Sequence, residues 1–470
     1  MKTSEYSALD ATALRELLVT GQVTAAEVEA VARECIAVVD SELNALAAPA
    51  FEPALHADPS GALAGVPFAI KDSGPVASGV PFSLGSRSIT AARSPVDSTI
   101  MVRFRAAGLV TLAQTTAPEY GLSFATESKR YGATRNPWNL DRGVGGSSGG
   151  AAALVAAGAV PLAHANDAGG SIRIPASSCG LVGLKPSRGR TPSGPLVGEA
   201  GFGLTVEFAV SRTVRDSALL LDCVSAHAPG EKYSMPTPLS RFVDAPTTDP
   251  GRLRIGVATA TAPGSFTDPQ ITRATVMCGE LLEWIGHELD EGGPTLATSD
   301  LLEAEMLAVY SSGAAILSLP HRPDEALLEA VSRQVLRETA SAGVVDVERA
   351  LAAQNRVTRG VADFFSHHDL LLTPTMAVLP LAIGALDYDD PDCTVRQWLQ
   401  RLLEVSPFVS AFNIAGNPAI SMPLAQSREG LPIGVQLVAA PGREDLLLAV
   451  AAQLEQAAPW SDRLPMIYAD

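Results

Sequence analysis

Short apolar segments alternate with helical segments along the chain, and this alternation restricts the possible fold more than any other feature. Residues 65–72 form an apolar run that is too short for a helix and ends on Lys71 and Asp72, which predicts a buried strand. A helix over 97–108 and a strand over 109–113 follow, and the pattern repeats as a helix over 151–158 and a strand over 160–165. Alternation of this kind predicts an α/β fold around a buried sheet.

The two ends of the chain fit the same scheme. Asp10 is placed to cap a first helix, and Thr24 with Glu27 forms a capping box that opens a second. Cys35 lies on the apolar stripe of that second helix, so we interpret it as a packing residue. Strands over 419–424 and 433–439 and a helix over 443–456 are predicted near the other end.

Two stretches depart from the alternation. Residues 229–252 are polar and rich in proline, which is typical of a long connection. Residues 299–367 read as helical and are predicted to form a cap over a pocket. We expect one domain over 1–470, made of N-terminal helices over 1–60, a core over 61–225 and the cap region over 299–367.

The charge of the chain excludes several classes of partner. Thirty-four Lys and Arg residues against 51 Asp and Glu residues give a net charge of −17. A negative field of this size repels phosphate backbones and anionic lipid headgroups. A nucleic-acid partner and a membrane partner are therefore not expected.

The cysteines and the apolar stretches indicate the cellular compartment. The five cysteines are far apart and show no CxxC pair or zinc-type spacing, so we expect reduced thiols and no metal site. The first residues lack the basic and then apolar pattern of an export signal. The longest apolar stretch, 151–163, is shorter than the roughly 18 residues of a membrane span. A cytoplasmic location is the expectation.

Two glycine-rich loops are the strongest candidates for a functional site. Residues 143–150 read GVGGSSGG, and residues 166–173 read NDAGGSIR. Glycines at this density let backbone N–H groups converge on one point, which favours an anion-binding concavity. Each loop also holds serine, so one shared site is indicated. A phosphate loop fits poorly, because no lysine follows the last glycine of either loop.

A serine needs a base to become a nucleophile. The chain has no GxSxG motif, and His164 lies in an apolar strand where a core imidazole is the expected role. Lys71 at the end of the first buried strand is the remaining candidate, because Ser–Lys pairs are a known alternative to Ser–His–Asp. Lys71 would have to lose its charge near neutral pH, which burial favours.

At this point the sequence resembles the amidase signature family of hydrolases. The matching motifs are GGSSGG over 145–150, Asp167, GGSIR over 169–173 and GLVGLKP over 180–186. Ile70-Lys71-Asp72, the RNPWN run over 135–139 and GNPA over 416–419 are also similar to the family. The resemblance covers nearly the whole chain. It implies a large central mixed sheet covered by helices on both faces, with a helical cap region.

The resemblance also implies roles for individual residues. Ser171 would be the nucleophile, Ser147 the relay serine next to a cis peptide, and Lys71 the base. The backbone N–H groups of three residues would form the oxyanion hole, and three further side chains would support the site. These are Ala168, Gly169 and Gly170 for the hole, and Ser148, Asp167 and Arg173 for the support. No cofactor and no metal is implied.

Some positions depart from the common family pattern. Asn166 and Ala168 stand where many members carry Thr and Ile or Thr, and Gly143-Val144 replaces a common Thr-Pro. The runs over 136–140, 166–168 and 174–177 are most similar to the branch that contains 6-aminohexanoate-cyclic-dimer hydrolase.

Three functions are compatible with these motifs. The favoured one is an amidase that hydrolyses a small-molecule carboxamide to a carboxylate and ammonia or an amine. A glutaminase subunit of a tRNA-dependent amidotransferase has the same motifs, and a non-catalytic binding protein on an amidase scaffold is the third. The sequence leaves the substrate open, and a homodimer is compatible with it.

Overall fold

The computed structural model describes residues 1–90, 92–261, 265–319 and 321–470, and a ten-stranded sheet runs through it. The strand order is β13-β12-β14-β16-β15-β10-β11-β9-β1-β4. In chain order these strands are β1 Pro67–Lys71, β4 Val110–Thr115, β9 Leu162–Asp167, β10 Val182–Lys185, β11 Val206–Ser211, β12 Arg254–Val257, β13 Glu288–Glu291, β14 Leu370–Pro374, β15 Ala419–Gln426 and β16 Pro432–Ala439. Three small pairs lie outside this sheet: β2 Pro81–Phe82 with β3 Ala92–Arg93, β5 Glu127–Ser128 with β6 Gly132–Ala133, and β7 Arg135–Asn136 with β8 Asn139–Gly143.

The sheet is mixed. Strands β9, β1 and β4 are parallel at one edge, and β13, β12 and β14 are parallel at the other. The neighbours between these two groups, from β14 through β16, β15, β10 and β11 to β9, pair antiparallel. The expected α/β class with a mixed central sheet is confirmed.

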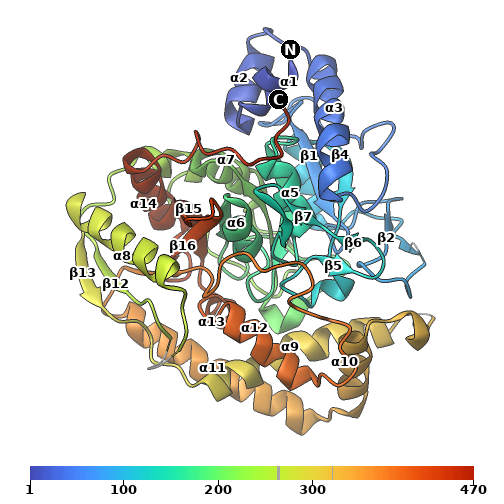
Figure 1. The fold of residues 1–470 in the computed structure, drawn as a ribbon, viewed down its shortest axis with the longest axis vertical. Coiled ribbons are helices and arrows are strands. Elements are labelled where there is room, and N and C mark those ends of the chain that lie inside the picture. Colours follow the sequence, from blue (N-terminus) through green and yellow to red (C-terminus); the bar gives the residue numbers. More distant parts are fainter. Residues whose placement is uncertain (91, 262–264, 320) are drawn as a thin grey trace.

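Helices lie on the sheet and at one end of it (Figure 1). Their bounds are α1 Thr3–Ser7, α2 Ala11–Val19, α3 Ala25–Leu43, α4 Thr99–Ala106, α5 Gly149–Ala156, α6 Arg173–Cys179, α7 Val214–Val224, α8 Pro269–Trp284, α9 Thr298–Leu317, α10 Ala330–Ser341, α11 Val344–Phe365, α12 Val395–Val405, α13 Ser410–Ala415 and α14 Glu444–Ala457. Four short 3₁₀ turns complete the described elements: η1 Glu119–Gly121, η2 Ala200–Gly203, η3 Phe242–Thr247 and η4 Glu325–Leu327.

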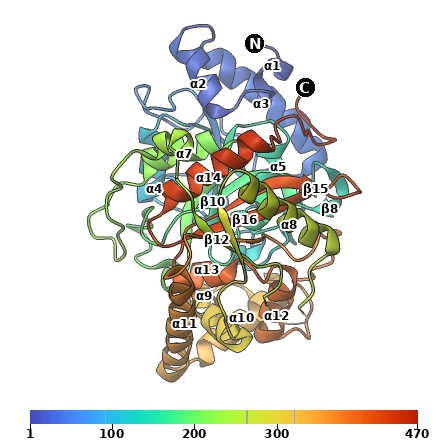
Figure 2. The ribbon, with the colours of Figure 1, turned by 90° about the vertical axis from the view of Figure 1, so that its left-hand side faces the viewer.

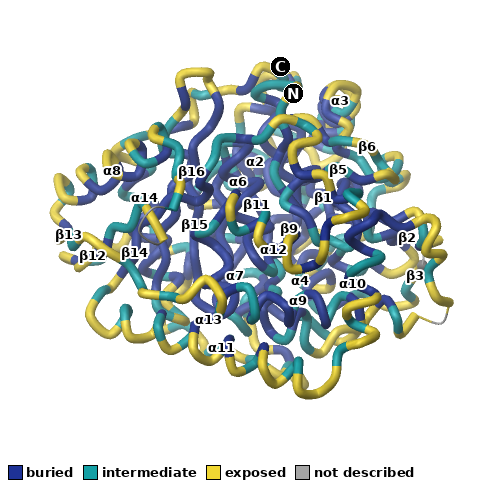
Figure 3. Tube along the Cα trace, turned by 60° about the horizontal axis from the view of Figure 1, so that its bottom comes forward, coloured by how far each residue is buried: buried dark blue, intermediate teal, exposed yellow. Residues whose placement is uncertain are grey.

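The central strands are covered on both faces. Helices α6 and α14 both pack on β15 and β16, while α5 packs on β9, β1 and β11. Every residue of β16 is buried, as expected for a strand between two helical layers. Figure 3 shows the central strands as a buried interior, with the exposed residues gathered on the outer helices, the loops and the edge strand β13.

Helices α9 to α13 gather at one end of the molecule, opposite the two termini, in both ribbon views (Figures 1 and 2). Helix α9 contacts α10, α11 and α13, and these helices share an apolar cluster separate from the larger cluster around the sheet. The region 299–367, predicted as helical, thus contains α10, α11 and nearly all of α9. Residue 320 of that region lies outside the described residues.

The local predictions at the N-terminus are largely confirmed. Asp10 accepts from the Ala13 N–H at the start of α2, and Thr24 and Glu27 form the capping box of α3. Cys35 is buried, and burial raises the pKa of its thiol to about 11. The prediction of two helices missed α1, a single short turn of helix before them.

One strand is displaced by two residues along the chain relative to its apolar pattern. We predicted a strand over 160–165, but β9 runs from Leu162 to Asp167, because Asn166 and Asp167 pair with Glu207 and Val206 of β11. This extension brings two polar residues to the end of the strand. In the described part of the chain, no helix is long and apolar enough to cross a membrane.

Candidate active site

Lys71 and Asn166 meet because β1 and β9 are parallel neighbours. Phe68 and Ala69 pair with Leu162 and Ala163, so both strands end at the same edge of the sheet. The Lys71 side chain is fully buried at that edge, and its Nζ donates to Asn166 Oδ1 at 2.6 Å. Groups brought together at the carboxyl ends of parallel strands are the usual basis of a site in this fold class.

The first glycine-rich loop supplies the other two partners of the lysine. Lys71 Nζ lies 2.7 Å from Ser147 Oγ and 3.0 Å from Ser148 Oγ, and both serines are buried. The Gly146–Ser147 peptide bond is cis. The structure therefore brings three of the predicted site residues, Lys71, Ser147 and Ser148, into direct contact.

Close backbone packing holds this loop in place. A Cβ atom on Gly146 would lie 2.6 Å from the carbonyl oxygen of Ser123, so only glycine fits without a shift. The hydroxyl of Thr126 accepts from the N–H of Gly149 at 3.1 Å and donates to the carbonyl of Gly145 at 2.8 Å. Thr126 thus connects both ends of the loop.

The second loop lies between β9 and α6 and contains Ser171, which is 5% exposed. The two loops are adjacent, because a Cβ atom on Gly145 would lie about 3.1 Å from atoms of Ile174 and Pro175 in α6. Gly170 has φ +137°, and a Cβ there would lie 2.8 Å from the Val409 side chain. The backbone before Ser171 consequently takes a course that favours glycine.

Asp167 and Arg173 hold the second loop in place through a buried ion pair. Arg173 Nε donates to Asp167 Oδ2 at 3.0 Å and its Nη2 donates to Oδ1 at 3.0 Å, with both side chains fully buried. Burial raises the pKa of the Asp167 carboxyl, but the positive charge of Arg173 outweighs it and holds that pKa well below its usual range. The N–H groups of Gly170 and Ile172 also donate to this carboxylate, at 2.6 and 3.1 Å.

Two residues from distant parts of the chain complete this network. Asn413 of α13 donates from Nδ2 to Asp167 Oδ1 at 2.8 Å, and Gln436 of β16 accepts from Arg173 Nη1 at 2.8 Å. Neither residue was predicted from the sequence. A polar side chain within each apolar run was the available signal, but nothing local connected either residue to Asp167 or Arg173.

A second network extends from Lys71 toward β11. Asn166 Nδ2 donates to Glu207 Oε1 at 3.4 Å, and Glu207 Oε2 lies 2.6 Å from His164 Nε2. His164 is fully buried, and burial lowers its pKa, which favours the neutral imidazole expected of a core histidine. Asn166 appeared in the sequence only as a departure from the family pattern, and Glu207 was missed.

The electrostatics of the site favour an uncharged lysine. Burial lowers the pKa of Lys71 to about 7, although the negative charges of Glu207 and Asp167 act in the opposite direction. An amine that is neutral near pH 7 and touches two serine hydroxyls can accept a proton from one of them. This arrangement can activate a hydroxyl for attack on a carbonyl.

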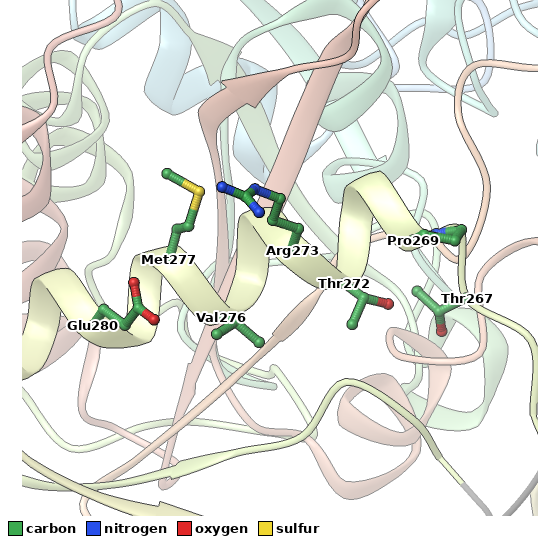
Figure 4. Close-up of a pocket in the computed structure, with 7 residues that line it drawn as sticks. All are labelled: Thr267, Pro269, Thr272, Arg273, Val276, Met277 and Glu280. Carbon is green, nitrogen blue, oxygen red and sulfur yellow. The ribbon is translucent and has the colours of Figure 1, made fainter.

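A hollow of about 470 Å³ lies along the outer side of α8, lined by residues such as Arg273, Met277 and Glu280 (Figure 4), and no predicted site residue lines it. Among the described residues, no group of three His, Cys, Asp or Glu side chains is arranged to hold a metal ion.

Comparison with known proteins agrees with the fold and identifies the family. The family model described as Amidase matches residues 21–448. The chain therefore belongs to the amidase signature family, and it is a hydrolase that acts on amide C–N bonds.

Individual relatives place the chain within that family. It is 39% identical to the 6-aminohexanoate-cyclic-dimer hydrolase of Paenarthrobacter ureafaciens, with 97% of this chain and 96% of the relative covered. It is 36% identical to a putative amidase, AmiC, of Mycobacterium leprae strain TN, with 96% of each chain covered. The solved structure of a 6-aminohexanoate cyclic dimer hydrolase complexed with substrate matches with a TM-score of 0.93 at 37% identity, covering 98% of this chain and 99% of that one. The resemblance noted in the sequence is thus confirmed.

Proposed function

We propose that this protein hydrolyses a small-molecule carboxamide through an acyl-enzyme formed on Ser171, with Ser147 and Lys71 as the other two members of a catalytic triad. The observation that carries the proposal is the contact of the buried Lys71 amine with the Ser147 hydroxyl at 2.7 Å. A lysine with a pKa near 7 is suited to general-base work at neutral pH.

The reaction would proceed in two halves. Neutral Lys71 takes the proton of Ser147, Ser147 takes that of Ser171, and the Ser171 oxygen attacks the amide carbon. Collapse of the tetrahedral intermediate breaks the C–N bond as Ser147 gives a proton to the leaving nitrogen and takes one back from the Lys71 ammonium. Water, activated by the same residues, then attacks the ester and releases the carboxylate from Ser171.

Backbone N–H groups of the second loop are the proposed oxyanion hole. Ala168 and Gly169 would donate directly, while the N–H of Gly170 would be shared with Asp167, to which it already donates at 2.6 Å. Loss of one such donor typically costs about 2.7–4 kcal/mol of transition-state stabilisation. Ser148, Asp167 and Arg173 would hold the two loops in position.

The wider organisation is part of the same proposal. A single domain over 1–470 is supported by a sheet whose strands come from both halves of the chain. The helices of the region 299–367 would cap the site, since α9 reaches the second loop through Glu305, whose carboxylate oxygens lie about 3.5 Å from where a Cβ on Gly169 would be.

Acid release from a panel of aliphatic, aromatic and lactam amides tests the function, with Ser171→Ala as the matched variant. We expect the wild type to release acid and to be labelled on Ser171 by an active-site fluorophosphonate. Ser171→Ala should keep the circular dichroism and melting temperature of the wild type while losing turnover by at least 10³-fold. Near-normal turnover by Ser171→Ala would place the nucleophile elsewhere.

A further inference from the structure

Helix α8 carries an exposed stripe of largely apolar side chains. The stripe follows the spacing of one helix face and consists of Pro269, Arg273, Val276, Met277, Glu280 and Trp284. Val276, Met277 and Trp284 are 43%, 53% and 79% exposed, whereas the opposite side of α8 is buried against β13, β14 and β16. An exposed tryptophan in line with other large apolar side chains is typical of a surface that contacts another protein.

Two rows of side chains form this stripe, and each row is spaced by four residues. Figure 4 shows Arg273 and Met277 on one side of the helix and Val276 on the other. Rows of this spacing are the ridges through which helices most often pack on one another. The first row is Pro269, Arg273 and Met277, and the second is Val276, Glu280 and Trp284.

The two rows match each other in charge when one of them is reversed. A twofold axis that passes between Val276 and Met277 places Arg273 of each copy opposite Glu280 of the other. Within one chain, neither of these charged side chains forms an ion pair with a described residue. Pairing of two copies therefore gives each charge a partner, in a closed contact for which both copies use the same patch.

The same axis places an aromatic side chain over a hollow. Trp284 of each copy comes to lie opposite Pro269 of the other, and Pro269 and Thr272 line the hollow of about 470 Å³ along α8. A second hollow, of about 440 Å³, lies between α8 and the ends of β12 and β13, and both hollows are lined by Val276 and Glu280. A row of side chains with a hollow on each side has the shape that packing of ridges into grooves requires.

We propose that two copies of this chain form a homodimer through antiparallel pairing of their α8 helices. The contact is independent of the amidase reaction, since no predicted site residue lies on α8. A helix of 16 residues is about 24 Å long, so this pair alone forms an interface at the small end of the range for specific complexes. The net charge of −17 on each chain also opposes association. We therefore expect a reversible dimer with a Kd in the micromolar range.

Sedimentation velocity of the full chain between about 1 and about 200 µM tests this dimer. The wild type should change from monomer to dimer as its concentration rises. Arg273→Glu and Glu280→Arg each set like charges against each other at both symmetry-related positions, so each should raise Kd at least tenfold. Trp284→Ser removes the aromatic contact at both ends of the helix pair and should also raise Kd at least tenfold.

A mixture of the two charge variants distinguishes this pairing from other contacts. Arg273→Glu in one copy and Glu280→Arg in the other restore opposite charges at both positions. An equimolar mixture should therefore form a heterodimer with a Kd within about threefold of the wild-type value. The double variant Arg273→Glu/Glu280→Arg should regain the homodimer for the same reason.

Arg359→Glu is the matched control. Arg359 is exposed on α11, so its substitution changes the net charge equally without altering α8, and Kd should stay the same. Melting temperatures equal to that of the wild type are expected for all these variants, because each substituted side chain is exposed. The proposal is overturned by a wild type that stays monomeric throughout, by a dimer that the three single α8 variants leave intact, or by a mixture that associates no better than its components.

Discussion

Lys71 can satisfy its hydrogen bonds in either protonation state. An ammonium has three N–H donors, and Nζ has three partners within 3.0 Å: Ser147, Ser148 and Asn166. A neutral amine keeps two donors and gains one acceptor, which a serine hydroxyl can fill by turning its proton toward the nitrogen. Loss of the charge therefore leaves no polar group unpaired at the site.

The pH dependence of turnover follows from this lysine. Because the base is the neutral form and its pKa is about 7, kcat/KM should rise from pH 5.5 through about pH 7 and level off above pH 8. Lys71→Met should lower kcat/KM by roughly 10²–10⁴-fold, the range usual for a lost general base. Rates measured from pH 5 to 9 check both points, and a flat wild-type profile would exclude Lys71 as the base.

Glu207 should shift the pH dependence of kcat/KM without contacting the substrate. Its negative charge raises the pKa of Lys71, so Glu207→Gln, which keeps the shape of the side chain and one of its two acceptor oxygens, should lower that pKa. The rising limb of kcat/KM against pH should therefore move to lower pH. A substitution that only disturbed the structure would reduce kcat/KM at every pH and leave the pH midpoint of the rising limb unchanged. Glu42→Gln on the exposed side of α3 serves as the control.

At the scale of elements, the loop before α5 depends on how closely that helix approaches its neighbours. A Cβ atom on Gly149 would lie 2.3 Å from Thr126 Oγ1 and 2.4 Å from Val144 Cγ2. Thr126 is the residue that joins the two ends of the loop. The start of α5 and the positions of Ser147 and Ser148 are thus set by the same contact.

Gly149→Ala tests this dependence. We expect a loss of about 1–3 kcal/mol in the free energy of unfolding from overpacking, together with a lower kcat/KM as Ser147 moves relative to Lys71. Denaturant titration and kinetics measure the two effects. Gly198→Ala is the matched control, since a Cβ atom there would have no atom of the described residues within 4 Å beyond its chain neighbours. Equal stability of the two variants would show that α5 can shift without cost.

Local elements were predictable because their causes are local. The Asp10 cap and the Thr24–Glu27 capping box involve residues three apart, and both were correct. The short apolar runs identified β1 and β15, but the apolar pattern did not locate the end of β9. That end depends on pairing with Glu207, which lies 41 residues from Asn166. The sequence motif marked Ser171, Ser147 and Lys71 as the candidate site, and their roles stay predictions.

At the scale of the whole molecule, the site residues that could not be predicted are those that the fold brings together from distant parts of the chain. Asn413 and Gln436 reach the Asp167–Arg173 pair across 246 and 263 positions. Their approach requires α13 to lie beside the second loop and β16 to pack against α6, and the place of β16 depends on antiparallel pairings in the middle of the sheet. No periodicity in one segment carries this information, because register between distant strands is a property of the folded chain.

Glu329 connects the helical region to the rest of the molecule and offers a test of stability. This residue occupies the N-cap position of α10 and is 3% exposed. Its Oε1 accepts from the N–H of Lys129 at 3.0 Å, and its own N–H donates to Glu119 Oε2 at 2.8 Å. Burial raises the pKa of Glu329 to about 7.

The sign of the resulting pH effect is fixed by linkage. The folded protein holds the Glu329 proton up to about pH 7, whereas the unfolded chain releases it near pH 4.5, so this group loses its stabilising contribution as pH rises between those values. Glu329→Gln cannot titrate. The melting temperature of the variant minus that of the wild type should therefore increase from pH 5 to pH 8, reflecting up to about 3 kcal/mol. Glu325→Gln, which removes an exposed carboxylate 3.4 Å from Arg337, should show no such trend. A difference that stays constant with pH would mean that Glu329 is ionised in the folded protein throughout this range.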